Sequence, residues 1–159
     1  MKKSETTYRH DLVRKLTFGF DKLVNLRDLP AATCSRELYQ IFLEKWDKKR
    51  LQYVEDFKVV YMNKQRRVIG VTTISNGAID YALVDIRVIM ANALSCGGVC
   101  IALAHNHPSG AVYPSDQDIQ LTKDISEAAR ILKLKVLDHI IIAPDTYYSF
   151  ADEDKINTD

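Results

Sequence analysis

The chain has 159 residues, 47% apolar and 27% charged, and 22 Lys and Arg against 21 Asp and Glu leave a net charge of +1. These values are ordinary for a globular protein, and a chain of this length buries roughly 70% of its unfolded surface, enough for one self-sufficient core. No apolar run approaches the roughly 18 residues of a membrane span, and the basic N-terminus lacks the apolar core of a signal peptide, so we expect no membrane association.

The first 50 residues predict a loose start followed by two helices. Residues 1–12 are expected to be poorly ordered, and residues 11–25 repeat apolar side chains every three or four positions, which indicates a helix. Pro30 should break the chain, and Ser35 should cap a second helix. The apolar positions are Leu12, Leu16, Phe20 and Leu23 in the first helix and Leu38, Ile41, Phe42 and Trp46 in the second.

The remainder of the chain alternates predicted strands with predicted helices. A hairpin is expected at residues 54–63 and 66–74, and a helix at residues 82–95. The short apolar run at residues 99–104 follows two glycines and indicates a buried strand. A helix at residues 115–132, a strand at 136–143 and an edge strand at 147–150 follow. This alternation predicts an α/β sandwich built on a sheet flanked by helices.

Residues 105–118 read HNHPSGAVYPSDQD and place His105, His107, Ser115 and Asp118 at the spacing H-x-H-x7-S-x-x-D. Residues two apart in an extended chain point to the same side, so both imidazoles can face one point. An S-x-x-D capping signature then brings Asp118 back toward the strand end. Two His and one Asp suit zinc and leave a fourth position for water, as in catalytic zinc sites. The same residues could simply cap a helix and lie unliganded at a strand end, and the spacing alone leaves both interpretations open.

The text around this motif resembles that of a known family. Segments 102–110 (ALAHNHPSG), 114–118 (PSDQD) and 137–142 (LDHIII) are similar to the JAMM, or MPN-plus, metal site and, more narrowly, to the RadC-like JAB domain proteins of bacteria. The resemblance implies a JAB/MPN-type (cytidine deaminase-like) three-layer α/β sandwich with a mixed sheet at residues 36–151. Residues 1–35 would form a partly helical leader, and residues 152–159 a tail. It also implies one zinc ion per chain held by His105, His107 and Asp118, with Ser115 polarising the substrate.

The family pattern requires a glutamate upstream of the metal motif as general acid and base, and Glu55 is the residue that matches it. A carboxylate near a metal-bound water can accept a proton and later deliver it to the leaving group. Asp56 is the neighbouring alternative, but strand alternation should point it to the opposite face. Without the resemblance, a Glu at the start of a strand would be taken for a solvated surface residue.

The chain departs from the family at several positions. Where the family reads V-H-P-R-E, this chain has Val84-Asp85-Ile86-Arg87-Val88, and a glycine expected after the predicted helix 115–132 is replaced by Lys133. That position is expected to adopt a left-handed cap conformation, which lysine tolerates less easily than glycine. We also expect only the JAB part of the family's architecture here, without its helix-hairpin-helix unit. His139 is either a hydrogen-bonded strand residue or an outer partner of the metal site.

These observations favour a zinc-dependent hydrolase, a metallopeptidase or isopeptidase acting on a peptide or protein substrate. The alternatives are a DNA-repair-associated accessory protein and a metal-dependent phosphodiesterase. Residues 1–50 carry 12 Lys and Arg against seven Asp and Glu, so weak nonspecific nucleic acid binding is expected. The three cysteines lack C-x-x-C spacing, and we expect reduced thiols in a cytoplasmic protein, with Cys96 and Cys100 in the core.

Overall fold

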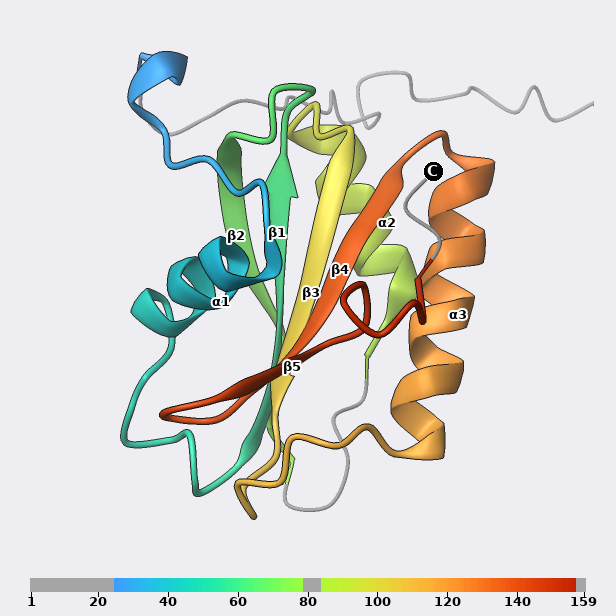
Figure 1. Ribbon diagram of the computed structural model, residues 1–159. Helices are drawn as coiled ribbons and strands as arrows, with labels where there is room; N and C mark the ends of the chain where they lie inside the picture. Colours follow the sequence, from blue (N-terminus) through green and yellow to red (C-terminus); the bar gives the residue numbers. More distant parts are fainter. Residues whose placement is uncertain (1–24, 79–83, 157–159) are drawn as a thin grey trace, which may run out of the picture.

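A computed structural model describes residues 25–78 and 84–156 of the chain. Its sheet has five strands in the order β2-β1-β3-β4-β5 (Figure 1). The pairing is mixed, since β3 and β4 run parallel and the other neighbours run antiparallel. The strands are β1 (Glu55–Met62), β2 (Val68–Ala78), β3 (Cys100–Asn106), β4 (Lys135–Ile142) and β5 (Tyr147–Ser149).

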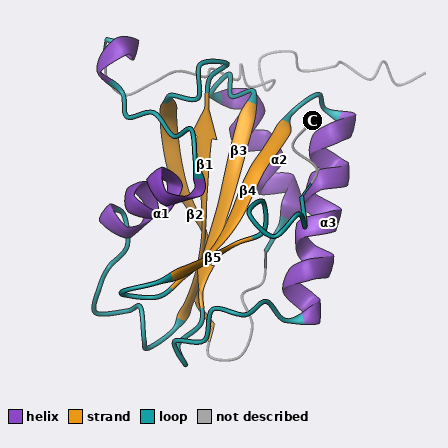
Figure 2. Cartoon of the chain, in the orientation of Figure 1, coloured by secondary structure: helices purple, strands orange, loops and turns teal. Residues whose placement is uncertain are grey.

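Helices cover both faces of this sheet (Figures 1 and 2). The apolar side of α1 (Ser35–Glu44) packs on one face, and α2 (Ile86–Ser95) and α3 (Asp116–Ile131) pack on the other. A short 3-10 helix, η2 (Leu26–Asp28), precedes α1. The predicted three-layer α/β sandwich with a mixed sheet is therefore confirmed.

Side-chain alternation along the central strands divides the core into two layers. In β1, Val59 and Tyr61 face α2 and α3, whereas Val60 and Met62 face α1. The parallel pairing of β3 with β4 contains a register shift, which resets the alternation in β4. As a result Val136, His139 and Ile141 share the α3 side although their spacing is not a simple period of two. This irregularity decides which residue of β4 lies beneath the metal motif.

Of the expected elements, one has a different cap residue, two have different end points, and one lies almost entirely outside the described residues. Cys34, and not Ser35, is the N-cap residue of α1, because the Ser35 hydroxyl instead donates to the Asp152 carboxylate at 2.6 Å. The helix expected at 82–95 begins at Ile86, where the Asp85 side chain accepts a hydrogen bond from the Arg87 N–H. The buried strand continues past residue 104 to Asn106. The helix expected at residues 11–25 lies almost entirely outside the described residues.

The three cysteines are free thiols in different surroundings. Cys100 is buried as expected, Cys96 is only half-buried, and Cys34 is exposed. Burial raises the pKa of the Cys96 and Cys100 thiols. Among the helices described, none combines the length and the apolar character needed to cross a membrane.

Candidate metal centre

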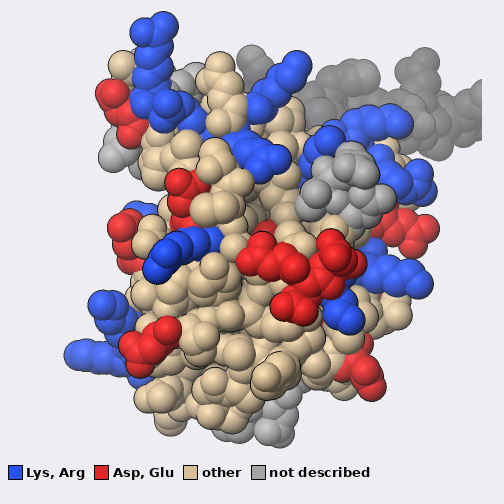
Figure 3. All heavy atoms as spheres, in the orientation of Figure 1, with Lys and Arg blue, Asp and Glu red and all other residues tan. Residues whose placement is uncertain are grey.

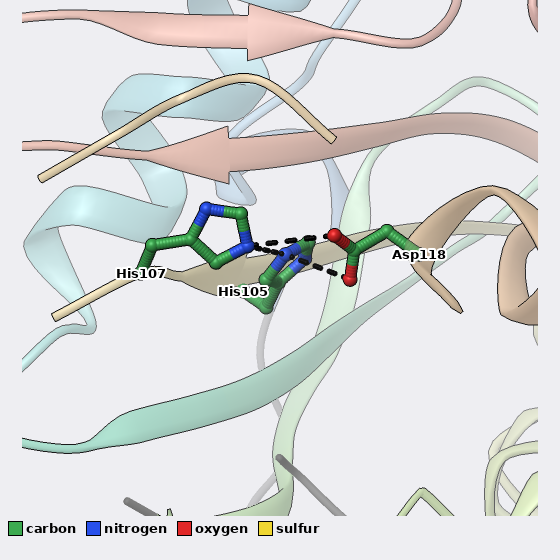
Figure 4. A group of neighbouring side chains, drawn as sticks. All are labelled: His105, His107 and Asp118. Atoms are coloured by element: carbon green, nitrogen blue, oxygen red, sulfur yellow. Dashed lines mark hydrogen bonds and ion pairs between the residues drawn. The ribbon is translucent and has the colours of Figure 1, made fainter. Parts of the chain in front are cut away.

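His105, His107 and Asp118 converge on one point at the end of β3 (Figure 4). The Nε2 atoms of the two histidines are 2.9 Å apart. The Nε2 atom of His105 lies 3.2 Å from Asp118 Oδ1, and that of His107 lies 3.4 Å from Asp118 Oδ2. The nitrogen and oxygen atoms that the three side chains offer all lie within 4.8 Å of one another. Such a group can hold a metal ion.

The strand end is fixed from both faces of the sheet. His105 pairs with Phe57 across β1, and both side chains are almost fully buried on the α3 side. Asn106 points the other way, as expected for the residue between the two histidines. Its side chain accepts a hydrogen bond from the Asp56 backbone N–H at 2.9 Å and donates to two backbone carbonyls of the segment 51–54. Asn106 thereby anchors the point where β3 gives way to the metal loop.

The loop and the first turn of α3 place the other two side chains. His107 Nδ1 lies 2.8 Å from the carbonyl oxygen of Ala111, to which it can donate, and Gly110 makes the turn at a φ of 78°. Ser115 and Asp118 form the predicted capping box: the Ser115 hydroxyl accepts from the Asp118 N–H, and the Asp118 carboxylate accepts from the Ser115 N–H. The same carboxylate also accepts from the Ser115 hydroxyl at 2.7 Å. The Asp118 carboxylate thus takes part in the cap of α3 and is also one of the three candidate ligands.

Charge at the site favours an ionised carboxylate. Burial raises the pKa of Asp118, but the neighbouring imidazoles of His105 and His107 outweigh burial and hold that pKa well below its usual range. The pKa of His107 is raised, chiefly by its hydrogen bond to Asp118 and against the effect of burial. An ionised carboxylate is the form that binds a metal.

Glu55, the candidate general base, is the first residue of β1 and lies two residues before Phe57, the partner of His105. Its negative charge is close enough to His107 to contribute to the raised pKa of that imidazole. Asp56 instead lies on the α1 side, where it is buried and forms an ion pair with Arg50 at 3.0 Å. The structure therefore separates the two neighbouring carboxylates, with the matching residue on the side of the histidines.

Two further residues extend the polar network beneath the candidate ligands. His139 Nε2 lies 2.8 Å from His105 Nδ1, and His139 Nδ1 lies 2.6 Å from the Thr122 hydroxyl. Burial lowers the pKa of His139 well below its ordinary value, so the imidazole is neutral. Thr122 was not singled out from the sequence, although it lies one helical turn after Asp118 and so on the same face of α3.

The departures from the family pattern have local explanations. Asp85 caps α2 and forms an ion pair with Arg87 at 2.7 Å, so it serves as a helix start at the place where the family has histidine. Lys133 adopts the expected left-handed conformation, with a φ of 60°. Its N–H and that of Leu134 close the end of α3 by bonding to the carbonyls of Arg130 and Ala129.

The profile of the RadC-like JAB domain matches residues 32–155. A UPF0758 protein of Flavobacterium johnsoniae is 43% identical over 99 residues, which cover 62% of this chain and 43% of that protein. A UPF0758 protein of Porphyromonas gingivalis is 44% identical over 100 residues, which cover 62% of this chain and 44% of that protein. The chain thus spans less than half the length of these curated relatives. With a match over most of its length to the domain that carries the metal motif, the chain belongs to the RadC-like JAB domain family.

Proposed function

We propose that this chain is a zinc-dependent hydrolase of amide or isopeptide bonds, with one ion per chain held by His105, His107 and Asp118. The observation that carries the proposal is the approach of both histidine Nε2 atoms to the Asp118 carboxylate, with the charge of Glu55 close by. Membership of the RadC-like JAB domain family supports it.

The chemistry of the donor set fits zinc. Two imidazole nitrogens and one carboxylate are ligands that zinc accepts, and three protein ligands leave a fourth position open. A zinc ion bound there would supply Lewis acidity and lower the pKa of a bound water to about 7. The hydrogen bond from His107 Nδ1 to a backbone carbonyl directs the Nε2 atom of that ring toward the other two candidate ligands.

Two side chains of this chain would then perform the proton transfer and orient the substrate. Glu55 accepts a proton from the attacking water and delivers it to the nitrogen that leaves. The Ser115 hydroxyl, which now donates to Asp118, turns to donate to the substrate carbonyl oxygen as negative charge develops there. The Ser115 backbone N–H keeps Asp118 in place during this rotation, because it bonds to the same carboxylate at 2.7 Å.

The proposal is tested by comparing Glu55→Gln with Asp56→Asn. Glu55→Gln should keep its zinc, since Glu55 is not among the three ligands, and should lose at least about 100-fold in cleavage of a peptide or isopeptide-linked lysine substrate. Asp56→Asn removes a neighbouring carboxylate that lies on the other face of the sheet, so it should leave cleavage near the wild-type rate. Zinc content by mass spectrometry and cleavage of a peptide library provide the readouts.

Two results would contradict the proposal. One is wild-type protein, purified without chelator, that repeatedly contains no zinc. The other is a Glu55→Gln variant that cleaves as fast as the wild type.

A further inference from the structure

A chain of hydrogen bonds beneath the candidate metal centre joins two of its three ligands through residues outside the ligand set. It runs from His105 Nδ1 to His139 Nε2 at 2.8 Å and from His139 Nδ1 to Thr122 Oγ1 at 2.6 Å. The Thr122 hydroxyl then donates to the backbone carbonyl of Asp118 at 2.6 Å. The chain therefore starts on a ligand of β3, passes through β4, and ends on the residue of α3 that supplies another ligand.

The last hydrogen bond of this chain, from the Thr122 hydroxyl to the Asp118 carbonyl, implies a direction for the other two. A backbone carbonyl can only accept, so the single hydroxyl proton of Thr122 points to Asp118. With that proton on the Asp118 carbonyl, Thr122 Oγ1 accepts from His139 Nδ1, and the other ring nitrogen of His139, Nε2, is then the acceptor for His105. Consequently His105 donates from Nδ1, and its own Nε2 lone pair faces His107 and Asp118.

The ring of His139 is enclosed by the core on the α3 side of the sheet. Its ring is fully buried and lies between Phe57, in an edge contact with centroids 5.5 Å apart, and Phe150, stacked at 4.8 Å. Its two ring nitrogens are both occupied by the hydrogen bonds to His105 and Thr122.

We infer that His139 and Thr122 form a positioning pair that selects the metal-binding tautomer of His105 and holds β3 and α3 at the spacing the ion requires. This inference rests on the metal centre of the proposed function. Neither residue belongs to the three candidate ligands. Outer partners of this kind typically change metal affinity by roughly 10–100-fold. A purely structural role would reduce stability without changing the affinity of the folded protein.

Thr122→Val is the sharpest test, because it removes the hydroxyl and keeps the shape of the side chain. We expect zinc and cobalt affinity, measured by competition with an indicator dye, to fall by roughly 10–100-fold. Thr122→Ser should restore affinity, since serine keeps the hydroxyl. Ser126→Ala is the matched control: Ser126 donates to the Thr122 carbonyl one turn further along α3 at 2.8 Å and has no link to His139. It should bind metal like the wild type.

A second measurement needs no metal. In metal-free wild-type protein, long-range ¹H–¹⁵N spectra of the imidazoles should show His105 and His139 each protonated on Nδ1. In Thr122→Val, the signals of both rings should change to a mixture of tautomers, whereas Ser126→Ala should leave them unchanged. His139→Gln, which keeps an acceptor for His105, should bind metal more tightly than His139→Phe, provided both variants are folded.

The outcomes separate this inference from the proposed hydrolase. If Thr122→Val is folded, binds zinc and cobalt as tightly as the wild type and keeps the wild-type tautomers, the inference is wrong. If Thr122→Val weakens metal binding but the wild type cleaves no substrate, the positioning pair stands and the hydrolase does not. If the wild type binds no metal, the proposed function fails. If, in addition, His105 of the metal-free protein is protonated on Nε2, the inference is wrong as well.

Discussion

Among individual residues, His107 is the candidate ligand that the fold requires least. Its side chain is 18% exposed and lies in a turn, whereas that of His105 is 1% exposed within β3. We expect His107→Ala to lose metal affinity by more than the roughly 100-fold typical of an outer partner, and to melt within a few degrees of the wild type. Ser109→Ala, in the same loop, is the control and should retain its metal. A His107→Ala protein that keeps one zinc would remove His107 from the ligand set.

Asp138 gives the protein a dependence of stability on pH. Burial raises the pKa of this carboxyl to about 6, even though it accepts hydrogen bonds from Ser149 and two backbone N–H groups. The unfolded chain has the ordinary value of 3.8. The folded state thus binds this proton more tightly. Protonated Asp138 therefore adds roughly 3 kcal/mol to the free energy of unfolding. This contribution is fully present below pH ~4 and is lost as the pH rises through about 6.

Asp138→Asn tests this origin, because an amide of the same shape does not ionise in this range. Urea unfolding from pH 4 to pH 7.5 should show the wild type losing stability relative to Asp138→Asn as the pH rises. A constant difference between the two proteins across that range would mean that Asp138 does not change its protonation there. The carboxyl is chosen for this test because it faces α1 and is remote in sequence from the three candidate ligands.

At the level of elements, local signals predicted most of the fold and contacts between distant segments decided the rest. The capping box at Ser115 and the apolar run before His105 depend on neighbouring residues, and both were predicted. The cap of α1 was predicted wrongly, because the Ser35 hydroxyl is taken by Asp152, 117 residues away. The position of His139 beneath His105 depends on the register shift between β3 and β4, which no local pattern reports.

The end of α3 carries a strain that a single substitution should relieve. Lys133 closes the helix in a left-handed conformation, which is costly for a residue with a Cβ atom. Lys133→Gly should stabilise the protein by roughly 0.5–1 kcal/mol, less than the full conformational cost because glycine also gains freedom in the unfolded chain. Lys133→Ala loses the same charge but keeps the strain, and should unfold near the wild-type midpoint. Equal midpoints for the glycine and alanine variants would contradict this account.

For the molecule as a whole, the basic turn between β1 and β2 and the candidate metal centre lie at opposite ends of the sheet. On the face drawn in Figure 3, Lys and Arg side chains lie at the upper end and along the left and right edges, whereas the lowest part, where β3 leads into the metal loop, is mostly uncharged. The turn between β1 and β2, at the upper end, contains Lys64, Arg66 and Arg67. A polyanion attracted to these side chains would bind far from His105 and its neighbours.

From the sequence we expect nucleic acid to bind weakly and without sequence preference, through basic residues of the first 50 positions, since the net charge is only +1. Titration of labelled duplex and single-stranded DNA should give weak binding at about 150 mM salt that weakens further as salt rises, because phosphate contacts release counterions. Replacing the exposed Lys48 and Lys49 with Gln should weaken it, and Lys123→Gln on α3 should not. A tight, sequence-selective complex that survives the Lys48 and Lys49 replacements would contradict this expectation, because selectivity requires contacts to bases and not to phosphates alone.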